Sequence, residues 1–140
     1  MPTIYKYQKV RDQYTTYCLV EPDYNLLETE DRITELCTIG GWTYASVPDD
    51  VKLPEQPKII AATLVKIDLA KEPETKAAIN AASSHIALIN DRVVAKIRLV
   101  YSSNEEFKML RVGGADFKAY NAYVEECRAW GKAAKAKLGL

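Results

Sequence analysis

The single histidine is the first residue to weigh for chemistry. His85 is the only imidazole in the 140-residue chain, so one chain cannot build a multi-histidine metal site or give a nucleophile a choice of bases. No serine or cysteine nucleophile motif accompanies it, and it directly follows Ser84, which we predict caps a helix. We therefore expect His85 to be a polar residue of a first helical turn rather than a catalyst.

The thiols do not form a metal or redox motif either. Cys18, Cys37 and Cys127 are odd in number, far apart in the sequence and without a C-x-x-C pair. Structural disulfides and a four-ligand zinc site are disfavoured by that spacing, so we expect buried free thiols and no bound metal.

Adjacent carboxylates occur at Asp49-Asp50 and at Glu105-Glu106. An acid and base pair must face each other across a cleft, and neighbours in sequence do not provide that geometry. Adjacent carboxylates in loops and first turns usually serve the turn or the helix dipole. We therefore predict no catalytic residue among them.

Paired glycines, at positions 40–41 and 113–114, are the remaining feature with a possible chemical use. Neither pair has the downstream Lys-Ser/Thr or the G-x-G-x-x-G context of a phosphate-binding loop. A turn and a helix C-cap are the better interpretations. The residues thus predict no catalytic, cofactor-binding or metal motif, and we expect a protein that is not an enzyme.

Composition places the chain among globular proteins. It is 48% hydrophobic and 27% charged, which argues against disorder. No stretch approaches the roughly 20 apolar residues of a membrane span, and the N-terminal residues lack the order of a signal peptide, so we expect a cytoplasmic protein. Residues 1–57 carry five basic and ten acidic side chains, a net charge of −5, and the remainder carries +5 because the whole chain is neutral. Opposite charges would favour docking of the halves or association of copies.

A proline-rich segment, residues 47–57, divides two regions of unlike composition. Its three prolines remove backbone donors and restrict φ, so neither a helix nor a central strand can continue through it. Before it lie short runs of Tyr, Thr, Val and Ile, and after about residue 73 lie alanine-rich segments with helical spacing. We predict an α+β chain: a small antiparallel β domain over 1–57 and a mainly helical domain over 58–140.

Two hairpins are predicted in the first region. Residues 3–10 and 14–20 are rich in strand-forming side chains, with a short turn at 11–13. Residues 35–39 and 42–47 flank Gly40-Gly41, the composition of a two-residue hairpin turn whose central positions need positive φ.

Three or four helices are predicted in the second region. Residues 58–69 are ambiguous, and their β-branched content favours a strand. Helices then follow over 73–82 and, capped by Ser84, to about 100. A third begins at a capping box with Ser103 as the cap and ends at Gly113. A last helix is capped by Asp116, and its predicted apolar face consists of Phe117, Tyr120, Val124, Cys127 and Gly131.

Aromatic side chains are the best candidates for partner binding, since tyrosine is frequent here, nine in all, and is enriched at interfaces. The alternative, tyrosine as half-buried core, is about as good an interpretation. Nucleic acid is disfavoured as a partner because the N-terminal aromatics lie in the acidic half, and membrane is disfavoured because the basic run 128–137 has little apolar face. The candidates are Tyr5, Tyr7, Tyr17, Trp42 and Tyr44 in the β region and Tyr120, Tyr123 and Trp130 in the last helix.

Four segments, in this order, resemble small uncharacterised proteins encoded in the tail-gene regions of tailed phages and prophages, near tail fibre genes. They are ELCTIGGWTY (35–44) leading into 47–57, AASSHIALIN (81–90), YSSNEEFKMLR (101–111) and YNAYVEECRAWG (120–131). The resemblance covers about residues 35–138, contains no catalytic motif and carries over no functional residue. It leaves residues 1–34 outside.

The resemblance implies a role in assembling or building the virion tail. We expect a non-enzymatic assembly helper, chaperone-like, that binds a tail fibre or baseplate subunit in the cytoplasm of the bacterial host. A minor structural component of the virion tail is the first alternative, and a small enzyme of unknown class is the second. No cofactor is expected, and association of copies into a homo-oligomer is possible from the charge asymmetry.

Overall fold

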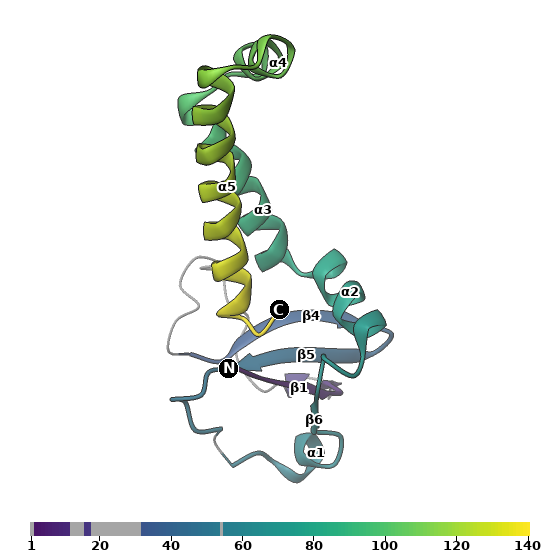
Figure 1. Cartoon of the computed structure of the whole chain (residues 1–140). Helices are drawn as coiled ribbons and strands as arrows, with labels where there is room; N and C mark the ends of the chain where they lie inside the picture. Colours follow the sequence, from purple (N-terminus) through teal and green to yellow (C-terminus); the bar gives the residue numbers. More distant parts are fainter. Residues whose placement is uncertain (1, 12–15, 18–31, 54) are drawn as a thin grey trace. The chain divides into compact units, whose positions relative to one another are not determined.

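The computed structural model describes residues 2–11, 16–17, 32–53 and 55–140 (Figure 1). The chain divides into two compact units. The first, the sheet unit, comprises residues 1–87 and 135–140, and the second, the helical unit, comprises residues 88–134. The antiparallel sheet in the N-terminal half and the helices in the C-terminal half confirm the predicted α+β class.

The sheet unit is built on four antiparallel strands in the order β4-β5-β1-β6. They are β1 (Thr3–Tyr7), β4 (Thr34–Ile39), β5 (Trp42–Val47) and β6 (Val65–Ile67). Two short strands, β2 (Val10–Arg11) and β3 (Thr16–Tyr17), pair with each other in a separate ribbon. The helices of this unit are α1 (Lys58–Ala61), α2 (Pro73–Ala82) and the start of α3 (Ser84–Val100).

The hairpin around the first glycine pair is confirmed. Strands β4 and β5 pair antiparallel, with Ile39 opposite Trp42. Gly40 and Gly41 have φ values of 57° and 82°, and positive φ at both central positions is what a type I′ turn requires. A register shift between Glu35 and Cys37 bends β4 away from regular pairing.

The predicted first hairpin is wrong for β1. This strand pairs with β5 and β6, so that Tyr5 lies opposite Ala45 on one side and Lys66 on the other. Only β2 and β3 pair locally, through Val10 and Tyr17, and residues 12–15 and 18–20 of the prediction lie outside the described residues. The physical reason is burial: Ile4 and Tyr7 point to opposite faces of β1 and are both buried, so the strand is stable between two neighbours rather than at the edge of a hairpin.

The strand predicted over 58–69 is correct only at its end. Residues 58–61 form the single turn of α1 after Pro57, and β6 covers Val65–Ile67. Ile60 is fully buried on α1 and packs with Tyr7 and Ala45, so tertiary packing favours the helical turn over the local β-branched preference. Since β6 lies beyond the proline-rich segment and pairs with β1, the compact units do not divide where the sequence predicted two domains.

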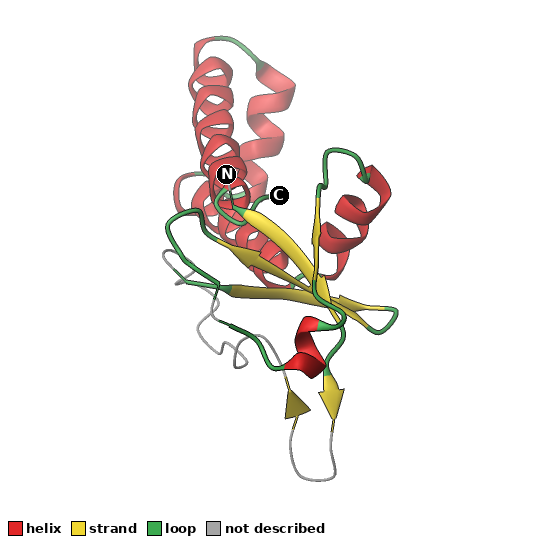
Figure 2. Cartoon of the chain, turned by 90° about the horizontal axis from the view of Figure 1, so that it is seen from below, coloured by secondary structure: helices red, strands yellow, loops and turns green. Residues whose placement is uncertain are grey.

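Each face of the sheet is covered by a helix. The cluster of Tyr7, Ala45 and Ile60 packs α1 against one face, and α2, whose Ile79 is fully buried, lies over the other face (Figures 1 and 2). Gly139, from the end of the chain, lies against Ile4 on β1 with a φ of 81°. The sheet is therefore the core of a two-sided layered unit.

The helical unit contains α3 from Leu88 onward, α4 (Ser103–Val112) and most of α5 (Ala115–Ala136). Helices α3 and α5 cross closely at Gly131, where an added Cβ would lie 2.5 Å from Val93 Cγ2. The Tyr123 hydroxyl of α5 donates to the Lys96 carbonyl of α3 at 2.7 Å. The predicted apolar face of the last helix is confirmed for four of its five members, which are buried: Tyr120, Val124, Cys127 and Gly131. The fifth, Phe117, is half-buried.

Three predicted caps are wrong by one or two residues. The residue that caps α4 is Ser102, whose hydroxyl accepts from the Glu105 backbone N–H at 3.2 Å. Ser84 is the first helical residue of α3, and Asp116 is the second of α5, so neither occupies the capping position. The glycine that ends α4 is correct: Gly113 has a φ of 70°. Local sequence indicates a cap to within one or two residues, and the backbone geometry decides which residue occupies the capping position.

Candidate protein-binding surface

Large apolar side chains are exposed along α3 and α4 of the helical unit. Helix α4 has no buried residue at all, so it does not contribute an apolar side to the core. Phe107 is 69% exposed and Leu110 is 60% exposed. The exposed large hydrophobic residues of this region are Val94, Leu99, Val100, Phe107, Leu110 and Val112.

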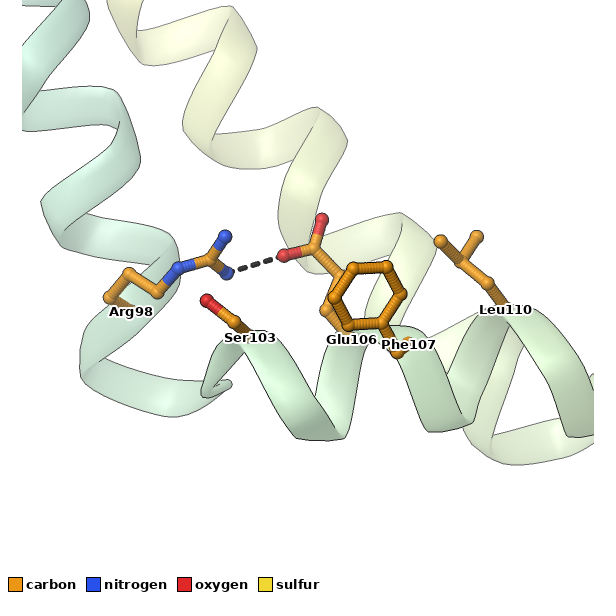
Figure 3. Close-up of a pocket in the computed structure, with 5 residues that line it drawn as sticks. All are labelled: Arg98, Ser103, Glu106, Phe107 and Leu110. Carbon is orange, nitrogen blue, oxygen red and sulfur yellow. Dashed lines mark hydrogen bonds and ion pairs between the residues drawn. The ribbon is translucent and has the colours of Figure 1, made fainter.

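Helical periodicity places Phe107 and Leu110 together. Residues three apart lie on the same side of a helix, and this side of α4 also carries Ser103 and Glu106. With Arg98 at the end of α3 they line a pocket of about 200 Å³ (Figure 3). We call Ser103, Glu106, Phe107 and Leu110, together with Arg98, the α4 face. It is a small hollow with an apolar rim and an ion pair beside it.

The carboxylate of Glu106 is held by two partners. The Arg98 guanidinium forms an ion pair with Oε2, which Figure 3 marks with a dashed line, and the Tyr120 hydroxyl donates to Oε1 at 2.5 Å. These two hydrogen bonds hold the pKa of Glu106 below its ordinary value, and the bond from Tyr120 has the larger effect. Burial, then the bond to Glu106, raises the pKa of Tyr120 to about 12. A carboxylate with these partners is ionised at neutral pH and engaged in structure, which makes it a poor proton shuttle.

The aromatic residues predicted on the sheet are only partly accessible. Tyr7 is fully buried in the core of the sheet unit. Tyr5, Trp42 and Tyr44 are half-buried, and the Lys6 ammonium lies 4.7 Å from the centre of the Trp42 ring. Tyr17 lies in β3, and its side chain is outside the described residues. Of the four predicted aromatics whose side chains the structure describes in this region, three are therefore partly accessible.

The aromatic residues predicted on the last helix serve the helical unit. Tyr120 is 5% exposed, and its ring contacts Tyr101 edge-on at 5.1 Å between centroids. Tyr123 is tilted against Tyr101 at 5.9 Å and bonds to α3 through its hydroxyl. Trp130 is 37% exposed, with the Lys96 ammonium 4.6 Å from its ring centre. Of these three, Trp130 is exposed, Tyr123 is half-buried and Tyr120 is buried.

The α4 face was not among the predicted site residues, although the sequence holds a signal for it. Phe107 and Leu110 share one side of the helix, whereas Val112 lies on a different side because a residue advances the helix by about 100°. A helix with two apolar directions and charged residues between them cannot bury all of its apolar side chains in one core.

The histidine and the described thiols are buried or half-buried. His85 is the second residue of α3, which agrees with the predicted position in a first helical turn. Its side chain is 3% exposed. Cys37 and Cys127 are free thiols, as predicted, but only Cys127 is buried and Cys37 is half-buried. Cys18 is outside the described residues. Burial, and then the nearby Glu35 carboxylate, raise the pKa of Cys37 to about 11, so this thiol is protonated and a weak nucleophile at neutral pH.

Comparison of the chain with family models, with curated proteins and with solved structures finds no match. In the part of the chain that the structure describes, no helix has both the length and the apolar character that crossing a bilayer requires.

Proposed function

We propose that this protein is a non-enzymatic assembly helper of a phage or prophage tail, which binds a tail fibre or baseplate subunit through the α4 face in the host cytoplasm. The observation that carries the binding role is the exposure of Phe107 and Leu110 side by side on a helix that buries none of its own residues. The tail role comes from the sequence resemblance.

Burial of these two side chains would supply useful binding energy. Moving one large apolar side chain fully out of water gains about 1.5–3 kcal/mol, and Phe107 and Leu110 are each more than half exposed. Aromatic side chains beside a small pocket are typical anchors of protein interfaces. A client that offers an apolar segment would cover the rim of the pocket and leave the Arg98–Glu106 ion pair at its edge.

The rigid support beneath the α4 face also favours binding. Arg98 of α3 and Tyr120 of α5 both hold the Glu106 carboxylate of α4. A helix held in place from two neighbours loses little conformational freedom when a partner docks, which lowers the entropic cost of association.

The test is to co-express the tagged protein with the products of its neighbouring genes and to analyse what is retained on purification. We expect a fibre or baseplate subunit in stoichiometric amount, with increased solubility. The Leu110→Ser variant should lose it, and the Leu99→Ser variant, which changes an 84% exposed residue outside the pocket, should retain it. If no product of the neighbouring genes is retained, the tail role is contradicted. If the Leu110→Ser variant retains the client, binding through the α4 face is contradicted.

A further inference from the structure

We infer that α4 undocks reversibly from α3 and α5 and unwinds, while those two helices stay packed against each other, so that the α4 face exists only in the docked state. The undocking is argued from the protein alone. Its consequence for a client rests on the proposed function, because the α4 face is the surface that would bind the client.

Few contacts hold α4 in place. None of its ten residues is buried. Glu106 and Met109 are half-buried, and the other eight are exposed. The side-chain hydrogen bonds that the structure describes between α4 and its two neighbouring helices both end on the Glu106 carboxylate, one from Arg98 and one from Tyr120. A segment that buries so little apolar surface opens at a lower free energy than the packed helices beside it.

The short length of α4 couples undocking to unwinding. Isolated helices of fewer than about 12–15 residues are marginal in water, and α4 has ten residues. Once the contacts of Glu106 are lost, the capping bond from Ser102 is too little to keep the helix formed. Undocking is therefore an order-to-disorder change of residues 103–112 rather than the swing of an intact helix.

The chain on either side of α4 permits this change. Before α4, the Tyr101 ring packs against Tyr120 and Tyr123, with centroid separations of 5.1 Å and 5.9 Å, which fixes the end of α3. After α4, Gly113 and Gly114 have φ values of 70° and 84°, and a Cβ added to either would meet nothing within 4 Å. Because no neighbour restrains this glycine pair and glycine has the widest choice of backbone conformations, it can absorb the change without disturbing α5.

Helices α3 and α5 keep contacts that do not involve α4. They approach closely where Gly131 faces Val93. The Tyr123 hydroxyl donates to the Lys96 carbonyl at 2.7 Å, and the Lys96 ammonium lies 4.6 Å from the centre of the Trp130 ring. The pair therefore remains packed when α4 is undocked.

Undocking removes the pocket of the α4 face. Four of the five residues that line it belong to α4, and the fifth, Arg98, belongs to α3 (Figure 3). A client that fills the pocket binds the docked state alone and shifts the population towards it. We expect the undocked state to be a minor population, so the pocket is formed in most molecules and the cost to a client is small.

Hydrogen exchange of the full chain in low concentrations of urea tests this inference. We expect the backbone amides of residues 107–112 in α4 to share one protection factor, about tenfold or more below that of residues 124–131 in α5. The α4 amides should also respond less to urea, because local opening exposes little surface. Equal protection in the two helices would overturn the inference, and so would protection that declines gradually from the ends of α4, which indicates fraying.

A matched pair of substitutions tests the role of Glu106. Glu106→Gln weakens the bonds from Arg98 and Tyr120 and should speed exchange of the α4 amides about tenfold. Glu125→Gln removes an exposed ion pair with Arg128 within α5 and should leave α4 exchange unchanged. Unaltered α4 exchange in Glu106→Gln would show that this carboxylate does not control undocking.

Limited digestion with trypsin provides a second measurement. Cleavage after Lys108 and Arg111 of α4 tracks the undocked population when cleavage is slow relative to redocking, so Glu106→Gln should be cut there faster than Glu125→Gln. A client retained in the pull-down should slow α4 exchange, and unchanged exchange with the client bound would overturn the link to client binding. Because the undocking is measured on the protein alone, it can be established or overturned whether or not a client is found.

Discussion

The Tyr120 hydroxyl of α5 donates a hydrogen bond of 2.5 Å to the Glu106 carboxylate of α4. The other oxygen of the same carboxylate pairs with Arg98 of α3, so all three helices of the helical unit meet at one side chain. Because α4 has no buried residue, these polar contacts attach it to its neighbours, as buried apolar side chains do for most helices.

Loss of the Tyr120 hydroxyl should loosen α4. Tyr120→Phe keeps the buried ring and its contact with Tyr101 but removes the donor to Glu106. A hydrogen bond to a charged group contributes about 1.5–3 kcal/mol, so we expect a loss in this range of unfolding free energy, measured by urea denaturation. Tyr5→Phe, at a half-buried position of β1, is the control and should change stability less. Equal effects of the two substitutions would argue against a special role for the junction.

Stability should fall in acid through Glu106. Its pKa in the folded protein lies below the ordinary value of 4.5, so the unfolded state binds the proton more readily. The stabilisation is present above that ordinary value and is lost as the pH falls through the folded pKa. Glu106→Gln should be less stable than the parent at pH 7, and the difference should shrink towards pH 3. Thermal unfolding at a series of pH values measures it, and a constant difference would contradict the prediction.

Helices α3 and α5 should not tolerate a methyl group at Gly131. The added Cβ would lie 2.5 Å from Val93 Cγ2, and a β-branched valine in a helix has little rotamer freedom with which to move aside. Gly131→Ala should therefore destabilise the protein by about 1–3 kcal/mol.

A double-mutant cycle provides the check. Val93→Ala removes the obstructing atom, so the double variant should be more stable than the sum of the two single effects predicts. Additive effects in calorimetry would show that the two side chains do not compete for space.

The cap of α4 can be tested with two adjacent serines. Ser102 accepts from the Glu105 N–H, whereas Ser103 is the first helical residue. Ser102→Ala should cost about 1 kcal/mol of stability and should weaken client binding, because the first turn of α4 carries part of the α4 face. Ser103→Ala should cost much less. If chemical denaturation ranks the two substitutions in the opposite order, the cap has been assigned to the wrong residue.

Local sequence determined much of this protein. Gly40-Gly41 predicted the β4–β5 hairpin because two positive φ angles demand residues without a Cβ clash. The helix over 73–82 was predicted with its observed ends, and so were the four buried residues of α5, because helical periodicity is a property of consecutive residues.

The tertiary structure decided what depends on distant residues. Strand β1 lies between β5 and β6 because burial of both its faces outweighs a nearby turn. The sequence alone could not decide whether Phe107 and Leu110 are exposed, because an apolar pair at helical spacing predicts burial equally well. Only the arrangement of α3, α4 and α5 shows that Glu106, rather than these apolar side chains, holds α4 to its neighbours.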